Sequence, residues 1–389
     1  MRRETPRILH VTESMNGGTA AAIVEFVRST PQFEHHLLFR GRLGGGRARA
    51  AAPVLPVRFE DLFAGSRDAG GGLGAGLGGG LLSLGRALRE TLPAVAPRIV
   101  HLHGGRAGLV GRTVIPAVAR SATGPVILYT PHCFGFERTD LPAVALRLLR
   151  GAERAVAAST DLAVCVSPRE AGLATELGIP AVVVPNTTRA RTARPDRTRH
   201  TGSVVTVGRV GAQKDFEFLL RVKALLPDPP GVTWTWVGGG DPRGEAALRA
   251  AGVRVTGWRS PAEVRNHLAA ADAFLHTAAW DSCPLPLLEA AAAGLPLVAR
   301  SIPALDSLGL DPDLGTAEAV AAELATVLAT GRPSRPRLQE AFAARHTPQA
   351  QAAALADAYA TALGTIPAPV PCASHPAAGS LTEVEVTRR

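Results

Sequence analysis

Lysine is almost absent from this chain: among 42 lysine and arginine residues, only Lys214 and Lys223 are lysines. The formal net charge is +9, yet no run of five basic residues occurs, and aromatic residues make up only 4% of the chain. Nucleic-acid binding needs clustered cations or stacking rings, so we expect no nucleic-acid partner. The scattered arginines still create a positive field, which leaves transient contact with anionic lipid open.

Long apolar runs and patterned cysteines are also missing. No stretch of eighteen apolar residues occurs, and the N-terminus lacks the apolar region of a secretion signal, so we expect no membrane-spanning helix and no leader. The four cysteines are far apart and lack metal-binding or redox spacing, which predicts reduced thiols in a cytoplasmic protein. The histidines His101, His103 and His132 lack the helical spacing of metal ligands, and no DxD motif occurs, so we expect no metal cluster and no cofactor.

What is present predicts an α/β protein of two domains. The 389 residues are 46% hydrophobic, which suits two cores of ordinary size, and apolar strands alternate with helices along most of the chain. The arginine-rich run RARTARPDRTRHTG is predicted to be a linker between the two strand–helix series. The predicted units are a first domain (1–190), a linker (191–202), a second domain (203–345), a C-terminal helix returning to the first domain (346–364) and a disordered tail (365–389).

The most informative stretch lies in the second domain, between residues 272 and 300. It reads as a strand (Ala273–Thr277), a loop (Ala278–Pro284), a helix (Leu285–Ala293) and a second strand (Pro296–Ala299). Such a unit forms a parallel sheet, and ligands bind in parallel sheets where the loops leave the carboxyl ends of the strands.

Two carboxylates flank the predicted helix N-terminus in this stretch. Asp281 lies in the loop and Glu289 in the first turns of the helix. A carboxylate can accept hydrogen bonds from both hydroxyls of a vicinal diol such as ribose. A glutamate early in an alanine-rich helix also has an ordinary explanation, because it stabilises the helix dipole in contact with solvent.

Glycine-rich turns follow three other predicted strands, and such turns let the backbone approach a phosphate or a sugar closely. Gly17 and Gly18 precede a helix, although a glycine pair is common at such a turn, and Gly208 and Gly239 follow two strands of the second domain. Near these turns, Arg209 and Lys214 are suited to binding a diphosphate. Trp258 is suited either to contact with a base or to forming a wall of the core.

In the first domain, His132 follows the predicted strand 126–130, where it is either structural or one of the reacting groups that gather at such an edge. Arginines share one face of the helix expected over 141–158, which is either a solvated face or one that touches anionic membrane. The glycine-rich run Ala69–Gly80 is predicted to be a mobile surface loop, because glycine is costly to order.

Taken in order, these pieces resemble the retaining nucleotide-sugar glycosyltransferases of family 4, which have the GT-B architecture. The resemblance implies an α/β fold of two Rossmann-like parallel-sheet domains facing each other across a cleft, and it extends from about residue 8 to residue 345. The matching segments are Gly17-Gly18, HLHGGRAGLVGR (101–112), YTPHCFGF (129–136), VCVSPREA (164–171), VPN (184–186), GRVGAQKDF (208–216), VGGGD (237–241), and Asp281 to Glu289 with PLPLLEAAAAGLPLVA.

The resemblance implies a role for each matching residue. Glu289 is expected to hold the donor ribose, and Asp281 to lie by the sugar ring with the loop residues that follow it. Arg209 and Lys214 match the pair that grips the diphosphate, and His132 matches a histidine next to the sugar. The loop residues are Ser282, Cys283, Pro284 and Leu285, and Gly17 and Gly18 match the amino-terminal loop near the reacting phosphate.

Two departures concern the same loop. Asp281 stands where glutamate is usual in the family and is one methylene shorter, and Cys283-Pro284 replaces the commoner glycine and aromatic content. The implied activity is metal-independent, retaining transfer from a nucleotide-diphosphate sugar to a hydroxyl of a glycan, lipid-linked or small-molecule acceptor, at the inner membrane face or in the cytoplasm. Two alternatives are a sugar-nucleotide epimerase on the same architecture and a non-catalytic sugar-nucleotide-binding partner protein.

Overall fold

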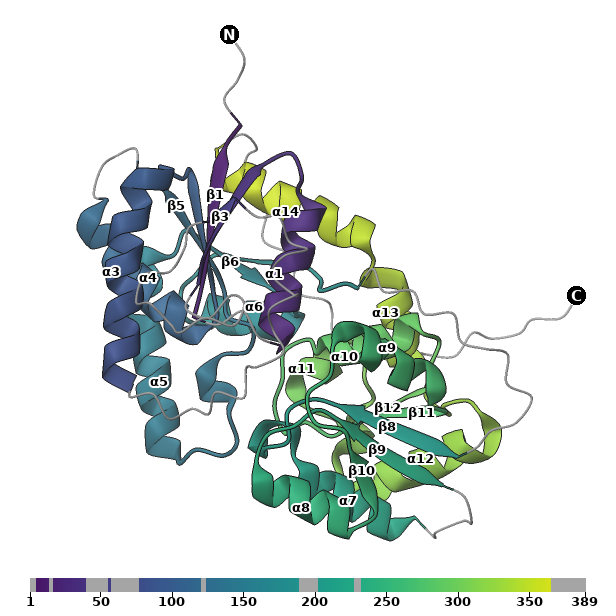
Figure 1. Cartoon of the computed structure of the whole chain (residues 1–389). Coiled ribbons are helices and arrows are strands. Elements are labelled where there is room, and N and C mark those ends of the chain that lie inside the picture. The colour runs from purple at the N-terminus through teal and green to yellow at the C-terminus, as the bar shows by residue number, and fades with distance from the viewer. Residues whose placement is uncertain are drawn as a thin grey trace, which may run out of the picture.

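The computed structural model describes residues 5–13, 17–39, 55–56, 77–119, 124–188, 202–226 and 232–364. These residues form two α/β lobes, each built on its own sheet (Figure 1). The prediction of two parallel-sheet lobes is therefore confirmed. The predicted tail and nearly all of the predicted linker lie outside the described residues.

The amino-terminal lobe is built on a seven-stranded sheet in the order β3-β2-β1-β4-β5-β6-β7. All of its described pairs are parallel except that of β3 with β2. The order reverses at β1 and β4, and ligand sites of parallel sheets form at such a reversal. The strands are β1 (Arg7–Thr12), β2 (Glu34–Phe39), β3 (Leu55–Pro56), β4 (Ile99–His103), β5 (Val126–Thr130), β6 (Leu162–Cys165) and β7 (Ala181–Val183).

The helices of this lobe connect the parallel strands. They are α1 (Gly17–Ser29), α3 (Leu77–Val95), α4 (Gly105–Val118), α5 (Ala143–Ala155) and α6 (Pro168–Glu176), with short 3-10 turns η2 (Gly135–Glu137) and η3 (Ala157–Ser159). The prediction that the whole run Ala69–Gly80 is a loop is wrong, because α3 begins at Leu77 and includes three of its glycines. Each glycine lowers the stability of a helix by about 1 kcal/mol relative to alanine, so the sequence predicts a loop here. Residues 69–76 lie outside the described residues.

The carboxyl-terminal lobe has a five-stranded parallel sheet in the order β10-β9-β8-β11-β12. Its strands are β8 (Ser203–Val207), β9 (Thr233–Val237), β10 (Val253–Val255), β11 (Ala273–His276) and β12 (Leu297–Ala299). Its helices are α7 (Phe216–Leu225), α8 (Pro242–Ala250), α9 (Pro261–Ala270), α10 (Leu285–Ala292), α11 (Pro303–Ser307), α12 (Ala317–Thr330) and α13 (Arg337–Arg345), with 3-10 turns η4 (Ala212–Lys214) and η5 (Pro312–Gly315).

Local sequence explains where these helices begin and end. The Ser260 hydroxyl accepts from the Glu263 backbone N–H while the Glu263 carboxylate accepts from the Ser260 backbone N–H, a capping box that starts α9. The Asp241 carboxylate caps α8 in the same position. Gly331 ends α12 with a φ of 72°, a conformation that costs other residues energy.

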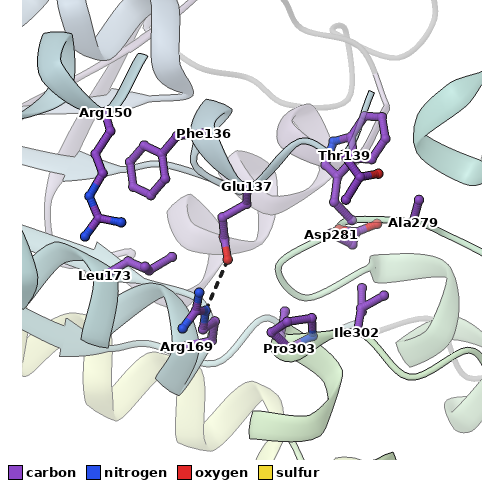
Figure 2. A pocket seen from close by; sticks show the side chains of 12 residues that line it. Phe136, Glu137, Thr139, Arg150, Arg169, Leu173, Ala279, Asp281, Ile302 and Pro303 are labelled. Atoms are coloured by element: carbon purple, nitrogen blue, oxygen red, sulfur yellow. Dashed lines mark hydrogen bonds and ion pairs between the residues drawn. The ribbon is translucent and has the colours of Figure 1, made fainter. Parts of the chain in front are cut away.

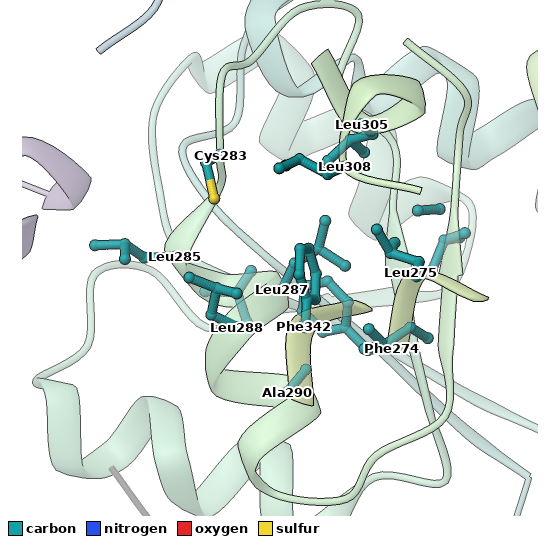
Figure 3. Close-up of a cluster of buried hydrophobic side chains, with 14 of the residues drawn as sticks. Phe274, Leu275, Cys283, Leu285, Leu287, Leu288, Ala290, Leu305, Leu308 and Phe342 are labelled. Carbon is teal, nitrogen blue, oxygen red and sulfur yellow. The ribbon is translucent and has the colours of Figure 1, made fainter. Parts of the chain in front are cut away.

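The helix α10 is held by a dense apolar core. Leu287, Leu288 and Ala290 are buried on its inner side, and Phe342 of α13 and Phe274 of β11 belong to the same cluster of buried side chains (Figure 3). Burying a leucine or phenylalanine side chain contributes about 1.5–3 kcal/mol, so this packing fixes α10 and the loop before it as a rigid element.

The last described helix, α14 (Pro348–Ala362), leaves the second lobe and packs beside α1 of the first (Figure 1). The Ser29 hydroxyl donates to the Gln351 side-chain oxygen over 2.9 Å, and the Tyr359 hydroxyl lies 3.0 Å from His101 Nδ1. Because Gln351 and Tyr359 are both fully buried, α14 contributes to the core of the amino-terminal lobe. Among the described helices, none is long and apolar enough to cross a bilayer.

Candidate active site between the lobes

Asp281 and Lys214 form an ion pair at the carboxyl edge of the second sheet. Lys214 Nζ lies 2.5 Å from Asp281 Oδ2, and each side chain is about 15% exposed or less. The Ser282 backbone N–H donates to Asp281 Oδ1 over 2.9 Å. Burial opposes ionisation of Asp281, but the ammonium of Lys214 and the neighbouring His276 together hold the pKa of the carboxyl below its usual value. The aspartate is therefore ionised at neutral pH.

Glycines let Lys214 lie against the backbone of its own strand end. A Cβ at Gly208 would be 3.0 Å from Lys214 Cγ, so the lysine stem covers this position. A Cβ at Gly238 would be 2.1 Å from the Gly208 carbonyl oxygen, which no side chain tolerates. The glycines that end β8 and β9 thus allow two backbone segments to touch beneath the lysine.

Two predicted donor-binding side chains are open to solvent on this edge. Arg209 is exposed, and its guanidinium makes no ion pair with another described residue. Trp258 is 56% exposed, and its indole lies beside Gly239, where a Cβ would be 3.3 Å from Nε1. Trp258 is therefore not a wall of the core, and it remains available to a ligand.

Glu289 lies on α10 in a partly buried position, one turn beyond the start of the helix. Burial raises the pKa of its carboxyl to about 7, although the positive charge of Arg265 acts in the opposite direction. Because burial disfavours the ionised form of this carboxyl, hydroxyl donors that bind the ionised form would lower its pKa again. The loop residues Ser282, Cys283, Pro284 and Leu285 are all buried, so they contribute backbone and shape to the site.

On the facing lobe, His132 follows β5 in a strained loop. Both His132 and Cys133 have positive φ angles, 53° and 90°, which residues other than glycine adopt at a cost. Glu170 of α6 stabilises this loop, because its carboxylate accepts from the Cys133 N–H over 2.7 Å and from the Val166 N–H over 2.8 Å. Burial raises the pKa of Glu170 to about 7, while these N–H donors act to lower it.

Glu170 is a residue that the sequence analysis missed, although it belongs to the quoted segment VCVSPREA. A glutamate three residues after the Ser167 cap is a usable sequence signal, because a glutamate at that position accepts from a backbone N–H at the helix start. Asn186 was also missed as a contact between lobes: its side-chain amide donates to the Cys283 carbonyl over 3.0 Å. The Ser167 and Ser282 hydroxyls lie 3.4 Å apart and form a second such contact.

Gly17 and Gly18 are exposed and are the first two residues of α1, whereas the sequence predicted that they precede the helix. A Cβ at either position would meet nothing within 4 Å, so neither glycine is required by packing. Space above them, at the N-terminus of a helix, is suited to an anionic ligand.

A pocket of about 210 Å³ lies between the lobes (Figure 2). Sites for drug-sized molecules occupy about 300–1,000 Å³, so this pocket has room for part of a donor or acceptor such as one sugar ring. Glu137 and Arg169 form an ion pair of 3.2 Å in its wall, and Asp281 lines it from the other lobe. The remaining lining residues are Phe136, Thr139, Arg150, Leu173, Ala279, Trp280, Ile302, Pro303 and Ala304.

Three buried histidines form a cluster that their spacing in the sequence does not indicate. His10, His101 and His103 are fully buried and place ring nitrogens within 4.8 Å of one another, an arrangement that can hold a metal ion. Sequence spacing could not reveal this, because the residues lie on β1 and β4, and only the pairing register sets His10 opposite His101. The rings of His35 and His132 extend the cluster, at 3.0 Å from His10 and 3.2 Å from His103.

Both lobes match models of glycosyltransferase families. A model described as "Glycosyl transferase 4-like domain" matches residues 17–187, and one described as "Glycosyl transferases group 1" matches residues 201–330. Among curated proteins, a UDP-Gal:alpha-D-GlcNAc-diphosphoundecaprenol alpha-1,3-galactosyltransferase of Escherichia coli is 26% identical over 230 residues, covering 52% of this chain and 58% of that protein. A 41.2 kDa protein from the cps region of Klebsiella pneumoniae is 21% identical over 77% of this chain and 82% of its own length.

Solved structures show the same two-lobed fold. A sucrose-phosphate synthase of Thermosynechococcus elongatus superposes with a TM-score of 0.72 at 16% identity, over 93% of this chain and 100% of that one. HepE of Anabaena, solved with UDP and glucose, superposes with a TM-score of 0.63 at 14% identity, over 93% and 100% of the two chains. The GT-B architecture predicted from the sequence is therefore confirmed.

Proposed function

The chain belongs to the group 1 glycosyltransferases, with a glycosyltransferase 4-like amino-terminal lobe, and from this premise we propose that it moves a sugar from a nucleotide-diphosphate donor to a hydroxyl acceptor with retention of configuration. The observation that carries the proposal is the arrangement at the edge of the second sheet. There, an exposed arginine, a lysine and glycine-lined backbone surround one strand end.

Arg209 and Lys214 supply the charge that the reaction needs. As the bond between the sugar carbon and the diphosphate breaks, negative charge grows on the leaving phosphate. A free guanidinium and an ammonium held at a fixed position stabilise that charge without first having to reorganise. Lys214 is already fixed by Asp281, so a bound diphosphate would add to an existing ion pair. We propose that these two cations suffice without a metal ion.

Glu289 and Trp258 are suited to the nucleoside. The carboxylate of Glu289 would accept from the two ribose hydroxyls, and these donors favour its ionised form, which burial alone disfavours. The exposed indole of Trp258 lies beside Gly239 on the same edge of the sheet, where it would contact the base. Asp281, shared between the ion pair and the pocket between the lobes, would face the donor sugar.

The acceptor would approach from the amino-terminal lobe. Its hydroxyl would attack from the face that the diphosphate leaves, and the departing oxygen would take the proton, which retains the anomeric configuration. Since the lobes contribute different halves of the site, closure over the donor would exclude water. The E. coli relative is named for a diphosphoundecaprenol acceptor, which favours a lipid-linked or polysaccharide acceptor here.

The helix α5 supports peripheral contact with a membrane. Val144 and Leu148 are 63% and 70% exposed on it, next to the exposed cations Arg147 and Arg154. Apolar side chains that can enter the headgroup region, with arginines beside them, favour binding to anionic lipid. We propose that a cytoplasmic enzyme uses this helix to reach an acceptor held in the membrane.

The test is incubation with a panel of nucleotide sugars, with and without EDTA, followed by measurement of nucleoside diphosphate release and of product configuration by proton NMR. Transfer or slow hydrolysis with the configuration retained, and unaffected by EDTA, supports the proposal. Interconversion of free sugars would indicate an epimerase, and tight binding without turnover would indicate a non-catalytic binding protein.

A further inference from the structure

A continuous chain of histidines links the interior of the amino-terminal lobe to the predicted active site. His35 lies on β2, His10 on β1, His103 on β4 and His132 just after β5. Successive rings are joined by contacts of 3.0 Å (His35 Nδ1 to His10 Nε2), 3.0 Å (His10 Nδ1 to His103 Nε2) and 3.2 Å (His103 Nδ1 to His132 Nε2). The far end of the chain is His35 Nε2, which lies 2.8 Å from the backbone carbonyl oxygen of Thr30.

That carbonyl sets the direction of the chain. A carbonyl oxygen can only accept, so His35 Nε2 must carry a proton. The Thr30 hydroxyl does not change this, because it donates to the Phe26 carbonyl over 2.8 Å and therefore can only accept from His35.

A neutral imidazole carries a single N–H, so each proton fixes the next. His35 Nδ1 is bare and accepts from His10 Nε2–H. His10 Nδ1 is then bare and accepts from His103 Nε2–H, and His103 Nδ1 accepts from His132 Nε2–H. The last ring keeps a bare Nδ1, for which no described residue provides a hydrogen-bond partner.

The neutral state follows from the surroundings of the rings. His10 and His103 are fully buried, and each ring nitrogen already faces another imidazole, so an added proton would place two N–H groups against each other. Burial lowers the pKa of every ring in the chain, that of His132 to about 4. The Coulombic effect of neighbouring histidines acts in the same direction for His10 and His103.

We propose that His35, His10 and His103 are positioning residues that fix the tautomer of His132, so that its bare Nδ1 accepts a hydrogen bond from a hydroxyl of the bound sugar. The part about the sugar rests on the proposed transferase function, whereas the tautomer is a property of the free protein. A metal ion on His10, His101 and His103 and this series of hydrogen bonds exclude each other, because both ring nitrogens of His10 and of His103 are used in bonds to other histidine rings.

The direct test is nitrogen-15 NMR of the full chain with labelled histidine, which distinguishes protonated from bare ring nitrogens. The expected result is the Nε2–H tautomer at His35, His10, His103 and His132 at pH 7. An Nδ1–H tautomer at His132 would overturn the proposal. So would stoichiometric binding of added Zn²⁺ that shifts the resonances of His10 and His103.

A matched pair of variants at the far end tests transmission along the chain. His35→Asn keeps an acceptor for His10 Nε2–H, whereas His35→Leu has a similar volume but no acceptor. We expect His132 to stay Nε2-protonated in the asparagine variant and to become a mixture of tautomers in the leucine variant. The value of kcat/KM should fall about fivefold to tenfold in the leucine variant alone, as the loss of one hydrogen bond implies.

The same proportion of His132 tautomers in both variants would refute the proposed chain of histidines. If the leucine variant fails to fold, the measurement on the unsubstituted protein still decides the question. The two proposals fail separately: the predicted tautomers with no turnover on any donor would refute the transferase alone. Turnover with an Nδ1–H tautomer at His132 would refute the chain alone.

Discussion

Replacing Lys214 by methionine removes the cation from the buried ion pair and leaves Asp281 without its partner. Both side chains are about 15% exposed or less, so solvent screens the pair weakly. Breaking such a pair on one side costs about 3 kcal/mol, because an uncompensated charge stays buried. In a unit the size of the second lobe, that corresponds to a fall in Tm of about 6–12 °C. The loss of the cation from the leaving diphosphate should also reduce kcat by about 100-fold.

The pH dependence follows from Asp281. In the unsubstituted protein its pKa is lowered, so it contributes stability above the pKa of the unfolded chain, and this stability is lost as pH falls through the lower folded pKa. Without Lys214, burial dominates and raises the pKa of Asp281, so the variant becomes relatively more stable as pH falls from 7 toward 4. The Tm difference between the two proteins should therefore shrink over this range.

Thermal unfolding between pH 4 and pH 8 is the assay, and Lys223→Met is the control, since it removes the other lysine, near the Trp234 ring. The double variant Lys214→Met, Asp281→Asn should recover most of the stability at pH 7 without recovering turnover. A Tm difference that stays constant with pH, or a double variant that is no more stable than Lys214→Met, would refute this reasoning.

Three further predictions concern the nucleoside, the base and the tail. Glu289→Gln should raise the donor KM about tenfold or more, because it weakens charged hydrogen bonds to the ribose. The raised pKa of Glu289 makes its ionisation costly in the folded protein, so the glutamine variant should become more stable relative to the unsubstituted protein as pH rises through 7. An unchanged donor KM would exclude Glu289 from the ribose. Trp258→Ala should raise the donor KM about tenfold with little change in Tm, as loss of base stacking implies for an exposed ring; equal affinity for the donor would show that the indole touches no base. Removing residues 365–389 should leave turnover and Tm unchanged in the same assays, and a large fall in Tm would contradict that expectation.

Much of the fold could be predicted because its signals are local. The strand predicted over 126–130 has the observed bounds of β5, and the strand, helix and strand predicted between residues 272 and 300 match β11, α10 and β12 to within one residue at each end. The prediction at α3 was wrong because the tertiary structure overrode the local preference of the glycines in its first turn, which disfavour a helix.

Candidate residues that share one loop could be selected from the sequence, whereas those that only strand pairing brings together could not. The loop around Asp281 was selected from the spacing of its acid to Glu289, yet its direct pairing with Lys214 appears only when β8 and β11 are paired side by side. The histidine chain depends on the register of β1 against β2 and β4, and no spacing along the sequence encodes that register. Glu170 was missed because its ligands are backbone N–H groups, which are identical in every sequence.

A crystal structure with the nucleoside diphosphate that the donor panel selects would test the proposed site most directly. The prediction is a diphosphate in contact with the guanidinium of Arg209 and the ammonium of Lys214, with the ribose hydroxyls on Glu289. A diphosphate bound elsewhere, with Lys214 still paired only to Asp281 and Glu289 facing no ligand, would contradict it.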